Sequence, residues 1–189
     1  MGPKQLMELL LSDNVYDRIK GGEEAFFDFF PELKVCKGFD QKNRWHIYDV
    51  YEHILRVVAG VEAKRTLRVT ALFHDMGKPP AFTLDDHGVG HFYGHWERSV
   101  EIFNKYAPIL DISQEETKLI RALIFYHDVN VDQLSQEELQ EMVDQIGKDN
   151  LYLLFVHKRA DLAAQSPAYH GTITKLMEQE KRLQQAFLA

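Results

Sequence analysis

The hydrophobic positions of this chain recur at helical spacing over almost its whole length. Apolar residues three and four positions apart, with polar residues between them, are typical of amphipathic helices that bury one face. Convincing period-two alternation, which would indicate half-buried strands, is absent. The pattern therefore predicts an all-α fold with helices over residues 3–11, 14–19, 25–30, 47–59, 64–76, 95–106, 114–126, 136–146, 151–164 and 173–187.

Two of these helices begin with a capping box, Ser113 with Glu116 and Ser135 with Glu138. The helical pattern is interrupted at residues 78–94, where glycines and prolines are followed by acids and histidines. Long loops inside compact domains often carry function. We therefore expect this segment to be a functional loop.

Four of the predicted helices point a histidine or an aspartate from a face that should be buried. These residues are His53, the doublet His74-Asp75, His127 and Asp161. One histidine on an apolar face is ordinarily a hydrogen-bonded core residue. An unpaired carboxylate in the same surroundings costs several kcal/mol, so two of them require a partner.

Three imidazoles and two carboxylates that converge on one core need a compensating positive charge. The sequence offers no evident cluster of buried arginines. A divalent metal would supply the charge, and mixed His/Asp ligation suits Mn, Fe, Co, Ni or Zn, with Mg also admitted. Cys36 is the single cysteine, which excludes a disulfide framework and a cysteine-based metal site.

The order of these residues resembles the H…HD…D pattern of the HD-domain metal-dependent phosphohydrolases. His53 lies in "YDVYEHILRV", the doublet in "LFHDMGKP" and Asp161 in "RADLAAQ". That superfamily folds as a helical bundle with the metal among its central helices. The resemblance implies the same architecture here.

A closer resemblance is to the HD portion of bacterial tRNA nucleotidyltransferases, the CCA-adding enzymes and their relatives. The segments "HIYDVYEHILRV", "ALFHDMGKP", "GVGHFYGHWERS" and "RADLAAQSP" are similar to that family's segments and follow in the same order. The sequence contains no nucleotidyltransferase signature of the G-[GS]-x-x-R-D or D-x-D type, so CCA addition is not expected. We expect a single HD domain over 1–189, made of a helical extension (1–44), the HD core (45–167) and a C-terminal helix (168–189).

The resemblance is compatible with either of two kinds of site, one that holds a single metal ion and one that holds two. A minimal HD site holds one ion with His53, His74, Asp75 and Asp161. Six-ligand members have two more histidines between the doublet and the last aspartate, and His95 and His127 fall in those positions. Asp75 would then bridge two ions, with a hydroxide held between them. In the alternative, the site holds one metal ion. His95 or His127 then contacts substrate, caps a helix, or forms a hydrogen bond to a metal ligand without binding the metal itself.

Three further residues have two interpretations each. Lys78 would meet a phosphate or remain a solvated surface lysine. Asp49 would orient the imidazole of His53 or favour the helix dipole as a first-turn acid. His91 would bind the substrate phosphate and act as a catalytic acid.

Some residues beside these motifs also have more than one possible role. Tyr93 or Trp96 could stack on a base, although aromatic residues at such positions more often pack. His157 precedes Asp161 by one turn, but the neighbouring Lys158 and Arg159 suggest that this part of the helix approaches solvent.

The resemblance implies a metal-dependent phosphohydrolase that acts on a phosphomonoester or phosphodiester by attack of metal-bound hydroxide. A nucleotide is the expected substrate, with 2′,3′-cyclic phosphodiesterase or phosphatase activity as first candidates. The alternative is a non-catalytic nucleotide- or RNA-binding HD module. A di-iron oxygenase comes third, because an oxygenase of the same fold uses the six-ligand His/Asp set.

The composition and charge of the chain limit which binding partners are expected. The 189 residues, 45% of them hydrophobic, suffice for one hydrophobic core. The formal net charge is −7, and the excess of acids lies between residues 111 and 150, as expected for solvated helix surface. A broad basic face is absent, so a small phosphoester is favoured over RNA. A signal-peptide pattern and a membrane-length apolar run are also absent, so we expect a cytoplasmic protein without a membrane partner.

Overall fold

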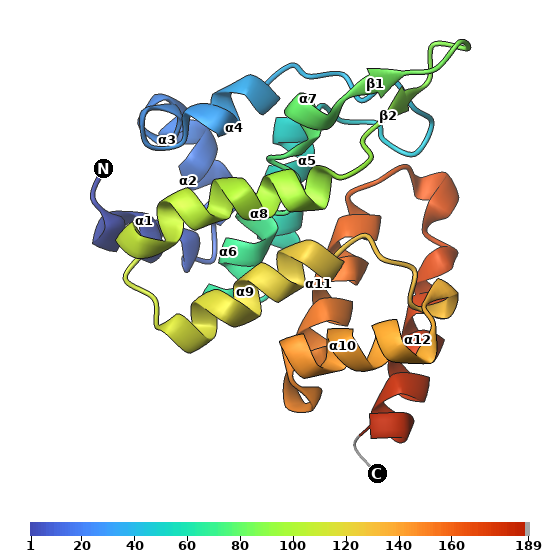
Figure 1. Cartoon of the computed structure of the whole chain (residues 1–189). Helices are drawn as coiled ribbons and strands as arrows, with labels where there is room; N and C mark the ends of the chain where they lie inside the picture. The colour runs from blue at the N-terminus through green and yellow to red at the C-terminus, as the bar shows by residue number, and fades with distance from the viewer. Residues whose placement is uncertain (188–189) are drawn as a thin grey trace.

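A computed structural model describes residues 1–187 and confirms the all-α bundle predicted from the sequence (Figure 1). The helices are α1 (Pro3–Leu10), α2 (Val15–Gly21), α3 (Glu23–Phe29), α4 (Pro31–Cys36), α5 (Val50–Gly60), α6 (Arg65–Phe73), α7 (Lys78–Ala81), α8 (His95–Tyr106), α9 (Gln114–Tyr126), α10 (Gln136–Ile146), α11 (Leu151–Ala163) and α12 (Thr172–Phe187). Two short strands, β1 (Thr83–Leu84) and β2 (Gly90–His91), form an antiparallel hairpin. Among the described helices, none is long and apolar enough to cross a membrane.

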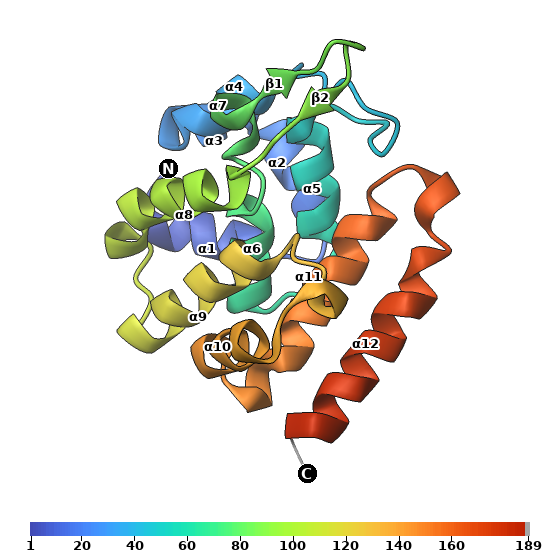
Figure 2. The same cartoon turned by 45° about the vertical axis from the view of Figure 1, so that its right-hand side comes forward.

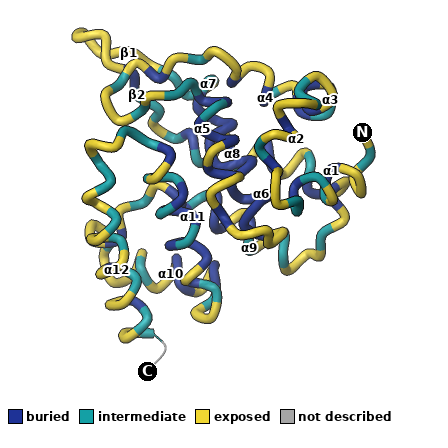
Figure 3. Tube along the Cα trace, turned by 180° about the vertical axis from the view of Figure 1, so that it is seen from behind, coloured by how far each residue is buried: buried dark blue, intermediate teal, exposed yellow. Residues whose placement is uncertain are grey.

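The centre of the bundle is the pair α5 and α6, and other helices surround it. α9 packs on α6, α11 packs on α5, and α8 and α10 pack on α9. The N-terminal helices α1, α2 and α4 cover the opposite side of the pair, and α12 lies along α11 (Figure 2). Figure 3 shows the buried segments concentrated in α5 and α6. All residues from Thr66 to Phe73 on α6 are buried, so this helix has no solvent face.

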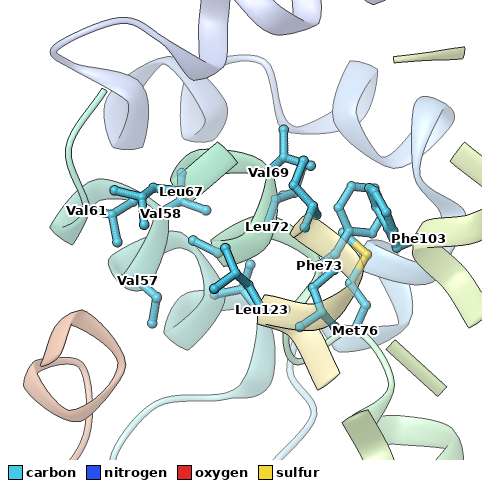
Figure 4. Close-up of a cluster of buried hydrophobic side chains, with 14 of the residues drawn as sticks. Val57, Val58, Val61, Leu67, Val69, Leu72, Phe73, Met76, Phe103 and Leu123 are labelled. Atoms are coloured by element: carbon cyan, nitrogen blue, oxygen red, sulfur yellow. The ribbon is translucent and has the colours of Figure 1, made fainter. Parts of the chain in front are cut away.

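Apolar side chains from α5, α6, α8 and α9 interlock in the core (Figure 4). Val58 of α5, Leu67 of α6 and Leu123 of α9 are among its buried members. The rings of Phe73 and Phe103 are 5.4 Å apart in an edge-to-face arrangement. Each such side chain contributes about 1.5–3 kcal/mol when fully buried. The cluster therefore provides a rigid frame for the polar residues at the helix ends.

Gly77 lets the turn after α6 approach α8 closely. A Cβ atom at this position would lie 2.2 Å from the carbonyl oxygen of His95 and 2.5 Å from the amide nitrogen of Ser99. The Ser99 hydroxyl joins the two segments, because it accepts from the Gly77 amide (2.9 Å) and donates to the His74 carbonyl (2.6 Å). Glycine at this position therefore holds the doublet His74-Asp75 against the start of α8.

We expect Gly77→Ala to destabilise the protein by about 1–3 kcal/mol, the typical cost of forcing an atom into a filled space. The melting temperature should fall by several degrees in a domain of this size. Gly21→Ala is the matched control, because a Cβ there meets nothing within 4 Å. Thermal scans should show that Gly21→Ala melts at the wild-type temperature or slightly above it. Equal melting temperatures for the two variants would contradict the close approach.

Several boundaries differ from the sequence predictions. The helix predicted from residue 47 begins at Val50, because the Asp49 side chain caps it by accepting from the Glu52 amide (2.6 Å). Helix α4 was not predicted, although Pro31 occupies the helix start where proline is tolerated. The predicted loop over 78–94 contains the one-turn α7 and the β1–β2 hairpin. Strands of two residues are too short to produce a period-two pattern.

Candidate metal centre

Four histidines and two aspartates meet where five helices approach one another. His53 comes from α5, His74 and Asp75 follow α6, His95 opens α8, His127 follows α9, and Asp161 lies in α11. The start of α8 and the end of α9 lie beside each other in Figures 1 and 2. The side chain of Asp161 is 13% exposed, and the other five are essentially buried. The structure thus brings together all six residues predicted as metal ligands, whose role as ligands stays a prediction.

Asp75 lies between two pairs of imidazoles. Its Oδ2 atom is 3.2 Å from Nε2 of His53 and 3.3 Å from Nε2 of His74. Its Oδ1 atom is 3.3 Å from Nε2 of His95 and 3.5 Å from Nε2 of His127. Each trio can hold a metal ion, and the two trios share Asp75. This is the arrangement in which one carboxylate bridges two ions.

Asp161 extends the cluster beside His53. Its Oδ1 atom is 3.0 Å from the Nε2 atom of that ring, on the trio that also contains His74. The Gln165 amide lies 3.4 Å from the same oxygen. Asp161 therefore lies beside one of the two trios, in contact with His53.

The other ring nitrogen of each histidine bonds to a backbone carbonyl. The Nδ1 atoms of His74, His127, His95 and His53 lie 2.7, 2.7, 2.8 and 3.3 Å from the carbonyl oxygens of Ala71, Ile124, Phe92 and Ala164, respectively. A carbonyl only accepts, so each Nδ1 carries the hydrogen and a neutral ring presents a bare lone pair at Nε2. This is the tautomer that metal-binding histidines adopt.

Ring nitrogens that face one another at such a distance need a cation between them, either a proton or a metal ion. The Nε2 atoms of His53 and His74 are 3.4 Å apart, and those of His95 and His127 are 3.1 Å apart. Neutral rings of this tautomer have no hydrogen to place in either gap. Oδ1 of Asp75 is also buried without a hydrogen-bond partner among the described residues. The donor set and its orphaned atoms therefore fit a divalent metal of the Mn, Fe, Co, Ni or Zn type.

Lys78 is buried beside the cluster, which corrects the alternative of a solvated surface lysine. Its Nζ atom lies 2.7 Å from Oδ2 of Asp75 and donates to Oε1 of the buried Gln41 at 2.9 Å. This ammonium offsets one of the two carboxylate charges. The other carboxylate, Asp161, lies 3.0 Å from Nε2 of His53.

The charges in the cluster shift several pKa values. Burial lowers the pKa of His53, but its bonds to Asp161 and Asp75 outweigh burial and raise it to about 9. Burial raises the pKa of Asp75, but His74 and Lys78 hold it well below its usual range. The carboxylate shared by the two trios is therefore ionised, as a metal ligand would need to be.

The orienting role predicted for Asp49 is wrong. Its two carboxylate oxygens accept from the backbone amides of Glu52 and Gly38, at 2.6 and 2.8 Å. One oxygen caps α5 and the other binds the Gly38 amide before it, whereas Nδ1 of His53 bonds to the carbonyl of Ala164. The other interpretation, in which Asp49 is an acidic residue at the start of the helix, agrees with the structure.

His157 and Lys158 are buried, so the prediction that this part of α11 approaches solvent is also wrong. The His157 ring packs edge-on against the rings of His74 and His127, at 4.9 and 5.9 Å. Lys158 donates to the carbonyls of His127 and Val129, each at 2.7 Å, and thereby holds the segment after α9. Helical spacing predicts this burial, because His157 follows Leu154 by three residues and shares its face.

A cavity of about 450 Å³ opens above the cluster. Asp75, Lys78 and Asp161 line its floor, and His91 lies on its wall. Nε2 of His91 is 3.0 Å from Oδ2 of Asp85, which fixes the ring. A larger cavity of about 610 Å³ lies between α4, α7 and α8 and touches none of the six clustered residues. A third cavity, of about 220 Å³, also touches His127 and Asp161, so the 450 Å³ cavity is the larger of these two that reach the cluster.

Comparison with known proteins gives one informative likeness. No family model matches the chain. A 138-residue stretch is 30% identical to the A-adding tRNA nucleotidyltransferase of Deinococcus radiodurans. The match covers 70% of this chain but only 28% of that relative. The likeness agrees with the resemblance drawn from the motifs and concerns only one part of the larger enzyme.

We expect metal removal to lower the melting temperature. A ligand that binds the folded state at 100 times its Kd stabilises it by about 2.7 kcal/mol, which corresponds to roughly 5–10 °C in a domain of this size. Thermal scans after chelation, and again after Mn²⁺ is restored, would measure the shift. Asp75→Asn should show no metal-dependent shift. Identical melting curves with and without metal would contradict a buried metal centre.

Proposed function

We propose that this protein hydrolyses a phosphoester bond with the help of one or two divalent metal ions. The observation that carries the proposal is the placement of Asp75 between two pairs of imidazoles whose Nε2 atoms all face its carboxylate. The relative that shares part of this sequence, an A-adding tRNA nucleotidyltransferase, is an enzyme that acts on a nucleotide, which supports a nucleotide as the substrate here. A divalent metal at this position acts as a Lewis acid and lowers the pKa of water.

The surrounding side chains suit a phosphoryl group. His53, His74, Asp75 and Asp161 would hold one ion, and His95 and His127 would hold a second one with Asp75. Lys78 presents an ammonium group at the cavity floor, where it would pair with a phosphate oxygen. His91 would contact the substrate phosphate from the cavity wall and give a proton to the leaving oxygen.

The substrate that fits best is a small phosphoester. A cavity of about 450 Å³ lies within the usual range of small-molecule sites, about 300–1,000 Å³. A nucleotide, cleaved as a 2′,3′-cyclic phosphodiester or as a phosphomonoester, stays part of the proposal. RNA is less favoured because the formal charge of the chain is −7.

A phosphoester screen tests the proposal. The protein would be loaded separately with Mn, Fe, Co, Ni and Zn and assayed against a panel of phosphomonoesters, linear phosphodiesters and cyclic phosphodiesters. We expect hydrolysis in at least one metal form and its loss in Asp75→Asn. Absence of hydrolysis in every form, beside active control enzymes, would refute it. Salt-dependent RNA binding without turnover would favour a binding module, and iron-dependent oxygen consumption would favour an oxygenase.

A further inference from the structure

The mouth of the cavity above the cluster is lined by aromatic side chains. Trp45, Phe92, Tyr93 and Trp96 all contribute to its wall. Tyr93 is 77% exposed and Trp45 is 44% exposed. Aromatic side chains ordinarily bury most of their large apolar surface. Two open rings at the entrance to a polar site therefore point to a ligand with an apolar, planar part.

The side chain of Tyr93 contributes little to the stability of the fold. Its ring is stacked on the ring of His91, at 5.3 Å between centroids and 7° between planes. The segment that carries it is nonetheless held firmly. Gly90 donates to the Lys42 carbonyl at 2.8 Å, and a Cβ on Gly90 would lie 2.2 Å from the Gln41 carbonyl oxygen. The structure thus presents a well-placed ring whose surface is mostly exposed.

Trp45 comes from another part of the chain, the loop between α4 and α5. The Ser166 amide donates to its carbonyl at 2.9 Å, and its ring centroid lies 3.9 Å from that of Tyr169. The turn after α11 therefore fixes this residue. Tyr93 and Trp45 thus approach one cavity from separate, anchored segments.

We propose that Tyr93 and Trp45 bind the planar ring of the substrate, so that the protein selects phosphoesters that carry a nucleobase over those that carry a sugar alone. The proposal rests on the proposed function for the phosphoryl end, which would lie deeper, at Asp75 and Lys78. Stacking on aromatic side chains accepts every base, because each base has a π-face. Selection by these residues therefore distinguishes a ring from no ring rather than one base from another.

Paired substrates measure this selection. AMP and ribose 5-phosphate share the phosphoryl group and the sugar, and they differ in the base. One stacked base is worth about 1–3 kcal/mol, so wild-type kcat/KM should be at least about fivefold higher for AMP. Tyr93→Ala should bring this ratio toward one, because it removes a ring on which only AMP has a base to stack. Tyr93→Phe, which keeps the ring, should retain the ratio.

Leu84→Ala is the matched control for the tyrosine variants. Leu84 is an exposed side chain of the same hairpin, and it does not line the cavity. Its removal should leave both substrates unaffected. A changed ratio in this variant would assign the effect to the hairpin as a whole and would overturn the role of Tyr93.

Binding without turnover separates this inference from the proposed function. Both tryptophans of the chain line the cavity, so their fluorescence reports a ligand at its mouth. AMP should quench at a concentration at least about fivefold lower than ribose 5-phosphate, and Tyr93→Ala should remove the difference. Equal titrations, or a ratio that Tyr93→Ala leaves unchanged, would overturn the inference even if hydrolysis occurs. If no phosphoester is hydrolysed, the proposed function fails and the titration still decides the inference.

Discussion

Asp75→Asn is expected to remove bound metal and catalytic activity together. Asparagine keeps the size of the side chain and loses the negative charge that both trios of candidate ligands share. Substitution of a residue that hydrogen-bonds to a metal ligand typically lowers metal affinity or activity by 10–100-fold. Loss of the shared ligand itself should exceed that range, so we expect metal content below about one tenth of wild type and a kcat/KM reduced by more than about 100-fold.

Metal analysis by mass spectrometry, beside phosphoester kinetics, measures both effects. Asp144→Asn on α10 is the control, because this exposed carboxylate contacts only Gln140 among the side chains described and should leave both quantities unchanged. Wild-type metal content in Asp75→Asn would contradict the assignment of the centre.

Folding of this variant needs a separate check. Asp75 pairs with the buried Lys78 at 2.7 Å, and breaking a buried ion pair costs about 3–5 kcal/mol. Asp161→Asn avoids this problem, because Asp161 is more exposed and, among the described residues, forms an ion-pair contact with His53 alone. A folded Asp161→Asn protein with reduced metal content would support the centre even if Asp75→Asn does not fold. Unchanged metal content in it would remove Asp161 from the candidate ligands.

The helices that carry the cluster could be predicted because their apolar stripes are long and regular. The stripe on α5 includes His53 and the stripe on α6 leads to His74, and both residues are buried in the structure, whereas Asp161 on α11 is half-buried. His127 follows the same logic one residue beyond α9. Local pattern therefore sufficed wherever a residue's position depended on its own helix.

Burial of Lys78 could not be predicted in this way. A lysine between glycine and two prolines resembles an exposed loop residue, and its burial depends on Gln41 and Asp75. The same limit applies to Gly77, whose sequence context indicates a helix stop. Its further role, the close approach to α8, depends on a segment about twenty residues away. Features that depend on contacts between distant segments are absent from any local periodicity.

The number of ions can be decided by a matched pair of substitutions, one in each trio. His74 and His127 make the same supporting contact, because each Nδ1 donates at 2.7 Å to the carbonyl three residues earlier. Asparagine at either position offers an amide nitrogen for that carbonyl and removes the Nε2 atom. His74→Asn and His127→Asn therefore change one trio each and disturb the backbone to a similar degree.

With two ions, wild type should hold about two equivalents and each variant about one, while both variants lose most of their activity. Both ions would be needed because a two-metal site stabilises both the attacking and the leaving oxygen. With one ion held near His53, His127→Asn should keep the wild-type content of one, and His74→Asn should hold none. Loss of all metal from both variants would contradict two separable sites. The comparison thus tests whether Asp75 bridges two ions or binds one beside a substrate-contacting pair, His95 and His127, whose Nε2 atoms lie only 3.1 Å apart.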